Sequence, residues 1–161
     1  MSSIAIIMGS QSDLEIVQEA INLLKEFKVG FEVKVLSAHR TPKELAEYVE
    51  GASKKGKIKV FIAAAGGAAA LAGVIASHTT LPVIGIPIET KSLKGLDSLL
   101  SIVQMPAGVP VACMAIGRAG AKNAAIFALE ILSLSDKKIQ SRLQAYKKQM
   151  KLKIIRTKIK L

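Results

Sequence analysis

Cysteine, histidine and large aromatic residues are scarce in this chain of 161 residues. It has no tryptophan, one cysteine and two histidines, and aromatic residues make up 4% of it. The single cysteine, Cys113, excludes an intrachain disulfide and fits a reducing compartment. Hydrophobic residues nevertheless make up 50% of the chain, so its core must be built from alanine, valine, isoleucine and leucine. At this length we expect one domain with a substantial core.

Long apolar runs are also missing. No run approaches the roughly 20 residues that a membrane-spanning helix requires. The chain passes from Met1 directly into an expected strand, without the basic and apolar segments of a secretory signal. We therefore expect a cytoplasmic protein that does not bind a membrane.

Acidic residues are outnumbered by basic ones, 12 to 23, which gives a net charge of +11. Seven of these basic residues lie in 147–161, where no residue is acidic, so the other 146 residues carry only +4. A basic tail can bind nucleic acid, but this one lacks the interleaved aromatic residues of a surface that binds single strands. We expect no nucleic-acid partner. The alternative is a solvated helix over about 136–161, capped by Asp136, with apolar residues that pack on a neighbouring subunit.

Apolar runs and helical patterns alternate along the whole chain, and no linker or repeat interrupts them. This alternation predicts a three-layer α/β sandwich with a parallel five-stranded sheet, formed by residues 1–161 as a single domain. The expected strands are 4–8, 31–36, 60–64, 82–87 and 111–116. Expected helices include 42–53, 68–77, 96–103 and 119–132.

One of the two histidines follows the second expected strand, where residues 37–42 are Ser-Ala-His-Arg-Thr-Pro. His39 and Arg40 therefore lie at the carboxyl end of a strand, which is where open α/β sheets bind ligands. Thr41 and Pro42 predict an N-cap hydroxyl and the first helical position. An imidazole beside a guanidinium favours proton transfer on an anionic substrate. Spacing alone leaves open the alternative of a surface histidine in a capping loop.

A similar loop follows the first expected strand, where residues 9–13 are Gly-Ser-Gln-Ser-Asp. The glycine allows a tight turn, Ser10 and Ser12 offer hydroxyl donors, and the first N–H groups of the next helix can meet an anion. These features suit a phosphate site, and ordinary helix capping is the alternative.

Four segments, in order and with the expected spacing, closely resemble the bacterial N5-carboxyaminoimidazole ribonucleotide mutases. They are residues 8–13, 37–42, 65–69 and 97–106, and the similarity runs from about residue 4 to residue 146. Arg40 and the 66–69 run resemble the mutase branch, rather than the branch that carboxylates aminoimidazole ribonucleotide directly with carbon dioxide.

The resemblance implies a flavodoxin-like fold and a homo-octamer with sites at subunit junctions, without a metal or an organic cofactor. It implies a substrate that is a ribonucleotide monophosphate carrying a carbamate, and a product with that carboxylate on carbon 4 of the imidazole, in de novo purine (IMP) biosynthesis. His39 is implied as general acid and base. The implied substrate-binding residues are Ser10 near the phosphate, Asp13 on the ribose, Ser37 and Arg40 at the phosphate, and Gly66, Gly67 and Ala68 around the imidazole.

Residues 66–73 depart from the pattern of that family. Its members usually have Gly-Gly-Ala-Ala-His-Leu-Pro-Gly, whereas this chain has Ala70 in place of the histidine and Ala72 in place of the proline. His78 lies eight residues beyond Ala70, so we expect it at a helix end and not as a replacement. The alternative to an active mutase is therefore a nucleotide-binding homologue with weak or no activity.

Overall fold

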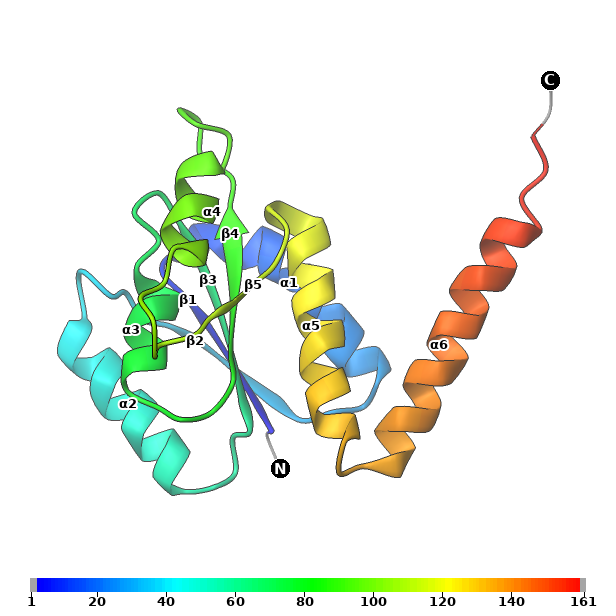
Figure 1. The fold of residues 1–161 in the computed structure, drawn as a ribbon, viewed down its shortest axis with the longest axis horizontal. Helices are drawn as coiled ribbons and strands as arrows, with labels where there is room; N and C mark the ends of the chain where they lie inside the picture. The colour runs from blue at the N-terminus through cyan, green and yellow to red at the C-terminus, as the bar shows by residue number, and fades with distance from the viewer. Residues whose placement is uncertain (1–2, 160–161) are drawn as a thin grey trace. The chain divides into compact units, whose positions relative to one another are not determined.

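A parallel five-stranded sheet forms the centre of the computed structural model, which describes residues 3–159 (Figure 1). The strands lie in the order β2-β1-β3-β4-β5, and all neighbouring pairs are parallel. This order is that of flavodoxin-like folds, so the predicted fold class is confirmed. The strands are β1 Ile4–Met8, β2 Phe31–Val35, β3 Val60–Gly66, β4 Val83–Ile88 and β5 Ala112–Cys113.

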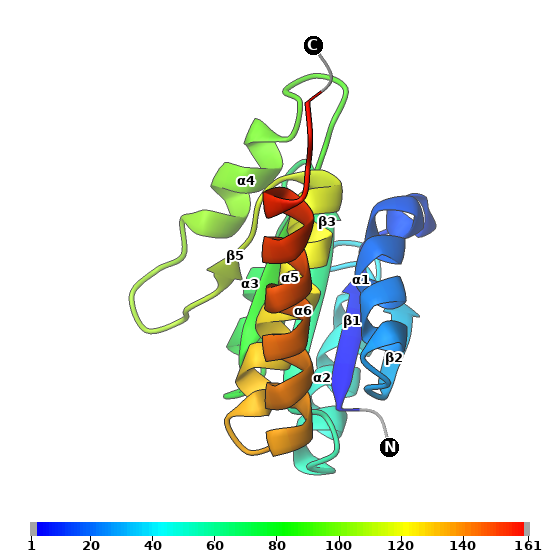
Figure 2. The same cartoon turned by 90° about the vertical axis from the view of Figure 1, so that its right-hand side faces the viewer.

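Helices cover both faces of the sheet. Successive residues of a strand point to opposite faces, and on one face Ile7 and Phe61 pack in a core cluster with residues of α2, α3 and α4. On the other side, Arg118 of α5 pairs with Glu15 and Glu19 of α1, and Figure 2 shows α1 running alongside β1 and β2. The helices are η1 Gln11–Asp13, α1 Leu14–Glu26, α2 Pro42–Lys54, α3 Leu71–Ser77, α4 Leu96–Val103, α5 Gly117–Ser133 and α6 Lys137–Ile155.

A glycine in β4 lets two helices approach the sheet closely. A Cβ atom at Gly85 would lie 2.5 Å from Cγ2 of Ile102 in α4 and 3.4 Å from the Cβ of Ala72 in α3. Ile102 is 1% exposed, so it has little room to move. Gly85 thus allows α4 to pack closely against β4.

Two predicted elements were too long by three residues or more. The fifth strand was expected over 111–116, but β5 has two residues, Ala112–Cys113, which pair with Ile84 and Gly85 of β4. The helix expected from residue 68 begins at Leu71. Gly67 and Ala69 have φ angles of 69° and 35°, which lie in the left-handed region that an α-helix of L-residues avoids.

Contacts divide the chain into two compact units, Met1–Ala128 and Leu129–Leu161. The second unit, described to residue 159, contains the end of α5 and α6. Asp136 caps α6 as predicted, since its side chain accepts from the N–H groups of Lys138 and Ile139. Within residues 3–159, no helix combines the length and apolar character needed to cross a membrane. The predicted tail ends with residues 160–161, which lie outside the described residues.

Candidate active site

The loop after β1 is held by its own side chains. Ser10 caps η1, and its Oγ accepts from the N–H of Ser12 at 3.3 Å and from the Ser12 hydroxyl at 2.9 Å. Asp13 completes a capping box by accepting from the N–H of Ser10 at 3.2 Å. Capping therefore occurs here, as the alternative interpretation expected. The hydroxyl of Ser12 also lies 3.3 Å from Oδ1 of Asp13, so the side chains of Ser10, Ser12 and Asp13 form one hydrogen-bonded group.

Asp13 is a buried carboxylate, 8% exposed. Burial raises the pKa of Asp13 above its ordinary value of 3.8, while the N–H of Ser10, the hydroxyl of Ser12 and the charge of Arg40 act in the opposite direction. The existing bonds do not fully offset the free-energy cost of burying this carboxylate. Asp13 is therefore suited to accept hydrogen bonds from a polar ligand.

The raised pKa of Asp13 predicts a pH-dependent gain in stability on replacing Asp13 with asparagine. A carboxyl whose pKa is raised by folding contributes stability below its ordinary pKa and loses that contribution as the pH rises through its folded pKa. As the pH rises from 3.8 through the raised pKa of Asp13, Asp13→Asn should therefore become more stable relative to wild type in thermal unfolding, and the difference in stability should level off above that pKa. Asp136→Asn is the control, since it replaces an exposed carboxylate with an equally good cap. A difference in stability between Asp13→Asn and wild type that stays constant with pH would contradict the prediction.

Arg40 joins the loops after β1 and β2. Its Nη2 donates to the carbonyl of Gly9 at 2.8 Å, and its Nε lies 3.4 Å from Oγ of Ser37. The same Oγ also accepts from the N–H of Arg40 at 3.2 Å. The guanidinium is exposed, so it holds the two loops together while its remaining donors face solvent.

Thr41 performs a different task from the one predicted. It occupies the N-cap position, and Pro42 follows at the first helical position as expected, but the Thr41 hydroxyl makes no capping bond. Instead, its Oγ1 accepts from the N–H of Ser37 at 2.8 Å and donates to the carbonyl of Ser37 at 3.1 Å. The hydroxyl thus closes the 37–41 turn, which keeps His39 at its tip.

A cavity of about 440 Å³ lies where the loops after β1, β2 and β3 meet. This volume falls in the range of small-molecule sites. The exposed His39 lines the cavity with Asp13 and Arg40, and most of the remaining wall is small side chains and backbone. A second hollow of about 300 Å³ shares Ser10, Ser37 and Arg40 with it. The rest of the larger cavity is lined by Gly9, Ser10, Ser12, Ser37, Ala38, Ala65, Gly66, Ala68, Ala69, Ala70 and Leu71.

The predicted site residues thus gather at one edge of the sheet, with one difference in the glycine loop. Gly66 and Ala68 line the cavity, whereas the N–H of Gly67 donates to Oγ of Ser98 at 3.0 Å. Sequence reasoning assigned no role to Ser98, although it lies in one of the four segments that carry the resemblance. No local pattern marks it, because its partner is 31 residues away.

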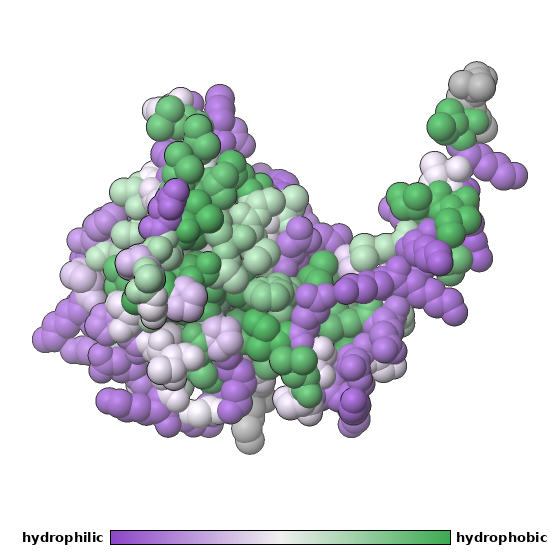
Figure 3. Space-filling view, in the orientation of Figure 1, coloured by the Kyte–Doolittle hydropathy of each residue, from purple (hydrophilic) through white to green (hydrophobic). Residues whose placement is uncertain are grey.

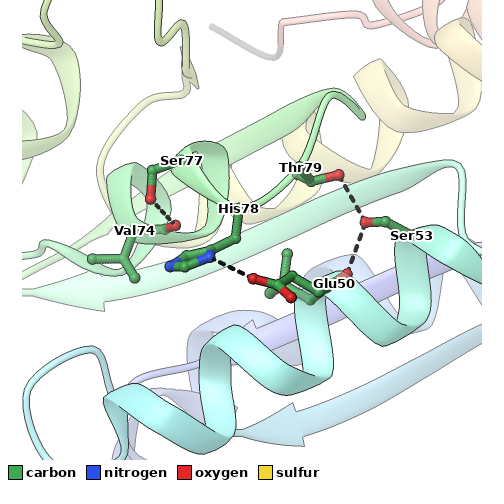
Figure 4. Close-up of polar contacts among 7 residues, drawn as sticks. Glu50, Ser53, Val74, Ser77, His78 and Thr79 are labelled. Carbon is green, nitrogen blue, oxygen red and sulfur yellow. Dashed lines mark hydrogen bonds and ion pairs between the residues drawn. The ribbon is translucent and has the colours of Figure 1, made fainter.

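His78 lies apart from this cavity, at the end of α3 (Figure 4). Its Nδ1 is 3.1 Å from Oε1 of Glu50 in α2, and beside this pair the hydroxyls of Ser53 and Thr79 are 2.8 Å apart. His78 is the C-cap residue of α3, so the predicted position at a helix end is confirmed. These contacts join α2 to α3.

A larger hollow of about 510 Å³ lies between β2 and α2 and has fewer side chains suited to catalysis. The Tyr48 hydroxyl in it donates to Glu32 at 2.6 Å, and Nζ of Lys34 lies 4.9 Å from the centre of the Tyr48 ring. Burial, followed by the bond to Glu32, raises the pKa of Tyr48. No histidine, cysteine or serine lines this hollow. Within residues 3–159, no cluster of three or more histidine, cysteine, aspartate or glutamate residues could hold a metal ion.

Comparison with known proteins gives consistent matches over nearly the whole chain. The AIR carboxylase family model matches residues 3–153. A Pyrococcus abyssi protein named N5-carboxyaminoimidazole ribonucleotide mutase is 56% identical over 151 residues, which cover 94% of this chain and 85% of that protein. A Saccharolobus solfataricus protein of the same name is 50% identical and covered over 99% of both chains. The crystal structure of Treponema denticola PurE matches with a TM-score of 0.86 and 29% identity, over 94% of this chain and 93% of that one. This chain therefore belongs to the AIR carboxylase family.

Proposed function

We propose that this chain is a mutase that converts N5-carboxyaminoimidazole ribonucleotide to 4-carboxy-5-aminoimidazole ribonucleotide in purine biosynthesis. The observation that carries the proposal is the cavity in which His39, Arg40, Asp13 and the glycine–alanine loop after β3 meet. The names of relatives at 50–56% identity support the same reaction, and nothing favours the non-catalytic alternative.

In this proposal the phosphate of the substrate binds where the two hollows adjoin. Ser10, Ser37 and Arg40 line both hollows, and they offer hydroxyl and guanidinium donors to phosphate oxygens. Asp13, buried nearby, accepts from the ribose hydroxyls. The imidazole then lies between His39 and the backbone at Gly66 and Ala68, with Gly67 supporting that backbone from behind.

His39 acts first as an acid and then as a base. Protonation of the carbamate nitrogen breaks its carbon–nitrogen bond and releases carbon dioxide within the cavity. Carbon 4 of the ring attacks this carbon dioxide, a carbon–carbon bond forms, and the now neutral imidazole of His39 removes the proton from carbon 4. One proton is given and one is taken, so the reaction is balanced without an oxidant. Histidine suits both steps because imidazole changes its charge near neutral pH.

Small residues form the wall that retains the carbon dioxide. Ala65, Ala68 and Ala69 present only methyl groups, and Ala70 adds another where the family has a second histidine. A wall without polar side chains offers no partner to a competing water molecule. We propose that His39 alone moves protons here and that neither a metal nor an organic cofactor takes part.

We also propose that the chain works as a cytoplasmic homo-octamer, with residues 1–161 as one α/β domain per subunit and no nucleic-acid partner. Exposed apolar residues support self-association: Leu96, Leu100 and Val103 of α4 are each about 50% exposed, and Figure 3 shows apolar side chains gathered over α4. Exposed apolar areas of this kind mark interfaces. Native mass spectrometry of the purified chain measures the number of subunits.

The test of this function is an assay with two substrates. Purified chain should convert the carbamate substrate to the 4-carboxy product. It should give far less product from aminoimidazole ribonucleotide and bicarbonate at matched concentrations. No product from either substrate would contradict the proposal. Product from the second substrate alone would assign the chain to the carboxylating branch.

We expect His78 to be dispensable, because it lies with Glu50 and Ser53 and not in the cavity. His78→Asn should change kcat by less than about two-fold, as for surface substitutions away from a site, and lower the free energy of unfolding by less than about 1 kcal/mol. Steady-state kinetics and thermal unfolding measure both effects. A ten-fold or larger fall in kcat at unchanged stability would show that His78 takes part in catalysis.

A further inference from the structure

Ser98 of α4 is the least exposed polar residue near the cavity. It is 0% exposed, and it and Asp13 are the buried polar residues among those described. Its Oγ donates to the carbonyl of Ile88, at the end of β4, at 2.7 Å and accepts from the N–H of Gly67 at 3.0 Å. The hydroxyl has one proton to give, so Ser98 connects the end of β4 to the loop after β3.

The loop that Ser98 holds is in an unusual conformation. Gly67 and Ala69 have positive φ angles, and alanine takes such angles only where its surroundings impose them. Ser101, one turn after Ser98, places its Oγ 3.4 Å from the carbonyl of Gly67. Both polar groups of Gly67 thus face serines of α4, while Gly66 and Ala68 on either side of it line the cavity.

The helix that carries these serines is itself fixed. Oγ1 of Thr90 donates to both carboxylate oxygens of Asp97 at 2.9 Å, which ties the loop after β4 to the first turn of α4. Ile102 packs closely on Gly85 of β4. Ser98 therefore projects from a rigid support, as a residue that positions a site must.

We propose that Ser98 is a positioning residue for the carboxyl transfer, acting through Gly67 to hold the 66–70 loop as a closed wall behind the reacting carbon dioxide. The inference rests on the proposed function. Without the hydroxyl, the half-buried N–H of Gly67 and the carbonyl of Ile88 both lose their bond to Ser98, and the loop relaxes from its strained angles. Carbon dioxide then escapes before carbon 4 attacks it, and free aminoimidazole ribonucleotide leaves the enzyme.

The partition of products tests this proposal. Each variant is given the carbamate substrate, and the 4-carboxy product and free aminoimidazole ribonucleotide are measured by chromatography, with decay in the absence of enzyme subtracted. Ser98→Ala should lower the ratio of product to free amine about ten-fold or more, since small misplacements in a site have large effects. A loss of folded protein alone lowers both rates and leaves their ratio unchanged.

Two further variants complete the design. Ser98→Cys keeps the shape of the side chain, with a somewhat larger sulfur that is a weak donor, so it should give an intermediate ratio even where Ser98→Ala is unstable. Ser53→Ala is the matched control: Ser53 also donates to a backbone carbonyl, that of Val49 at 2.7 Å, but lies away from the cavity. Its ratio should equal that of wild type.

A wild-type ratio in folded Ser98→Ala and Ser98→Cys would overturn the role of Ser98 while the proposed function stands. Equal loss of ratio in Ser53→Ala would also overturn it. A wild-type chain that forms no 4-carboxy product would overturn both proposals.

Discussion

Replacing His39 with asparagine should lower kcat about 10²–10⁴-fold, the usual contribution of general acid–base catalysis. Asparagine keeps a hydrogen-bonding side chain of similar reach but does not exchange protons near neutral pH. KM should change little, because phosphate and ribose binding are assigned to Ser10, Asp13 and Arg40. His39 is exposed at the tip of a turn closed by Thr41, so the variant should fold normally.

His78→Asn is the matched control for this experiment, since it makes the same substitution at the other histidine of the chain. Single-turnover kinetics with excess enzyme isolate the chemical step from product release. If His39→Asn kept more than a tenth of the wild-type single-turnover rate, His39 would not be the proton carrier.

Replacing Arg40 with glutamine should weaken binding of the nucleotide about 10–100-fold, the effect of losing a hydrogen bond with a charged group. The loss should appear in KM and in the calorimetric Kd of the product nucleotide, with a smaller effect on kcat. Arg40→Lys should give an intermediate affinity, because an ammonium keeps the charge without the forked donors. Removing the cation also removes a contribution that lowers the pKa of Asp13, so that pKa should rise further.

Binding of the nucleoside that lacks the phosphate distinguishes loss of the phosphate contact from a general disturbance of the loops. Its affinity should be the same for wild type and Arg40→Gln, because the proposed lost contact is to the phosphate. Arg40 also joins two loops through Gly9 and Ser37, so a general disturbance of the loops would weaken the nucleoside as well. That outcome would contradict the phosphate role and leave Arg40 with a structural one.

The sequence was sufficient to predict elements whose cause is local. The apolar run of β1 and the helical pattern of α4 predicted their bounds, because burial and periodicity act over a few residues. The loops with Ser10 and His39 were each predicted to follow a strand of a parallel sheet, and parallel strands place their carboxyl ends together.

Features that depend on the conformation of a turn or on distant partners could not be predicted in this way. Thr41 has the residue type of a cap, yet its hydroxyl bonds to Ser37, and only the conformation of the turn decides between these uses. β5 is short because only Ala112 and Cys113 pair with β4, which its longer apolar sequence does not reveal. Ser98 resembles any serine on a helix until the N–H of Gly67 is placed beside it.

A crystal structure of the chain with the 4-carboxy product bound would decide where the chemistry takes place. We expect the phosphate to contact Arg40 and Ser10, and an imidazole nitrogen of His39 to lie about 2.6–3.2 Å from the new carboxylate or the ring. The ring should face Gly66 and Ala68. A nucleotide bound in the hollow beside Tyr48, or a His39 side chain turned out of the cavity, would refute the proposed site and its mechanism.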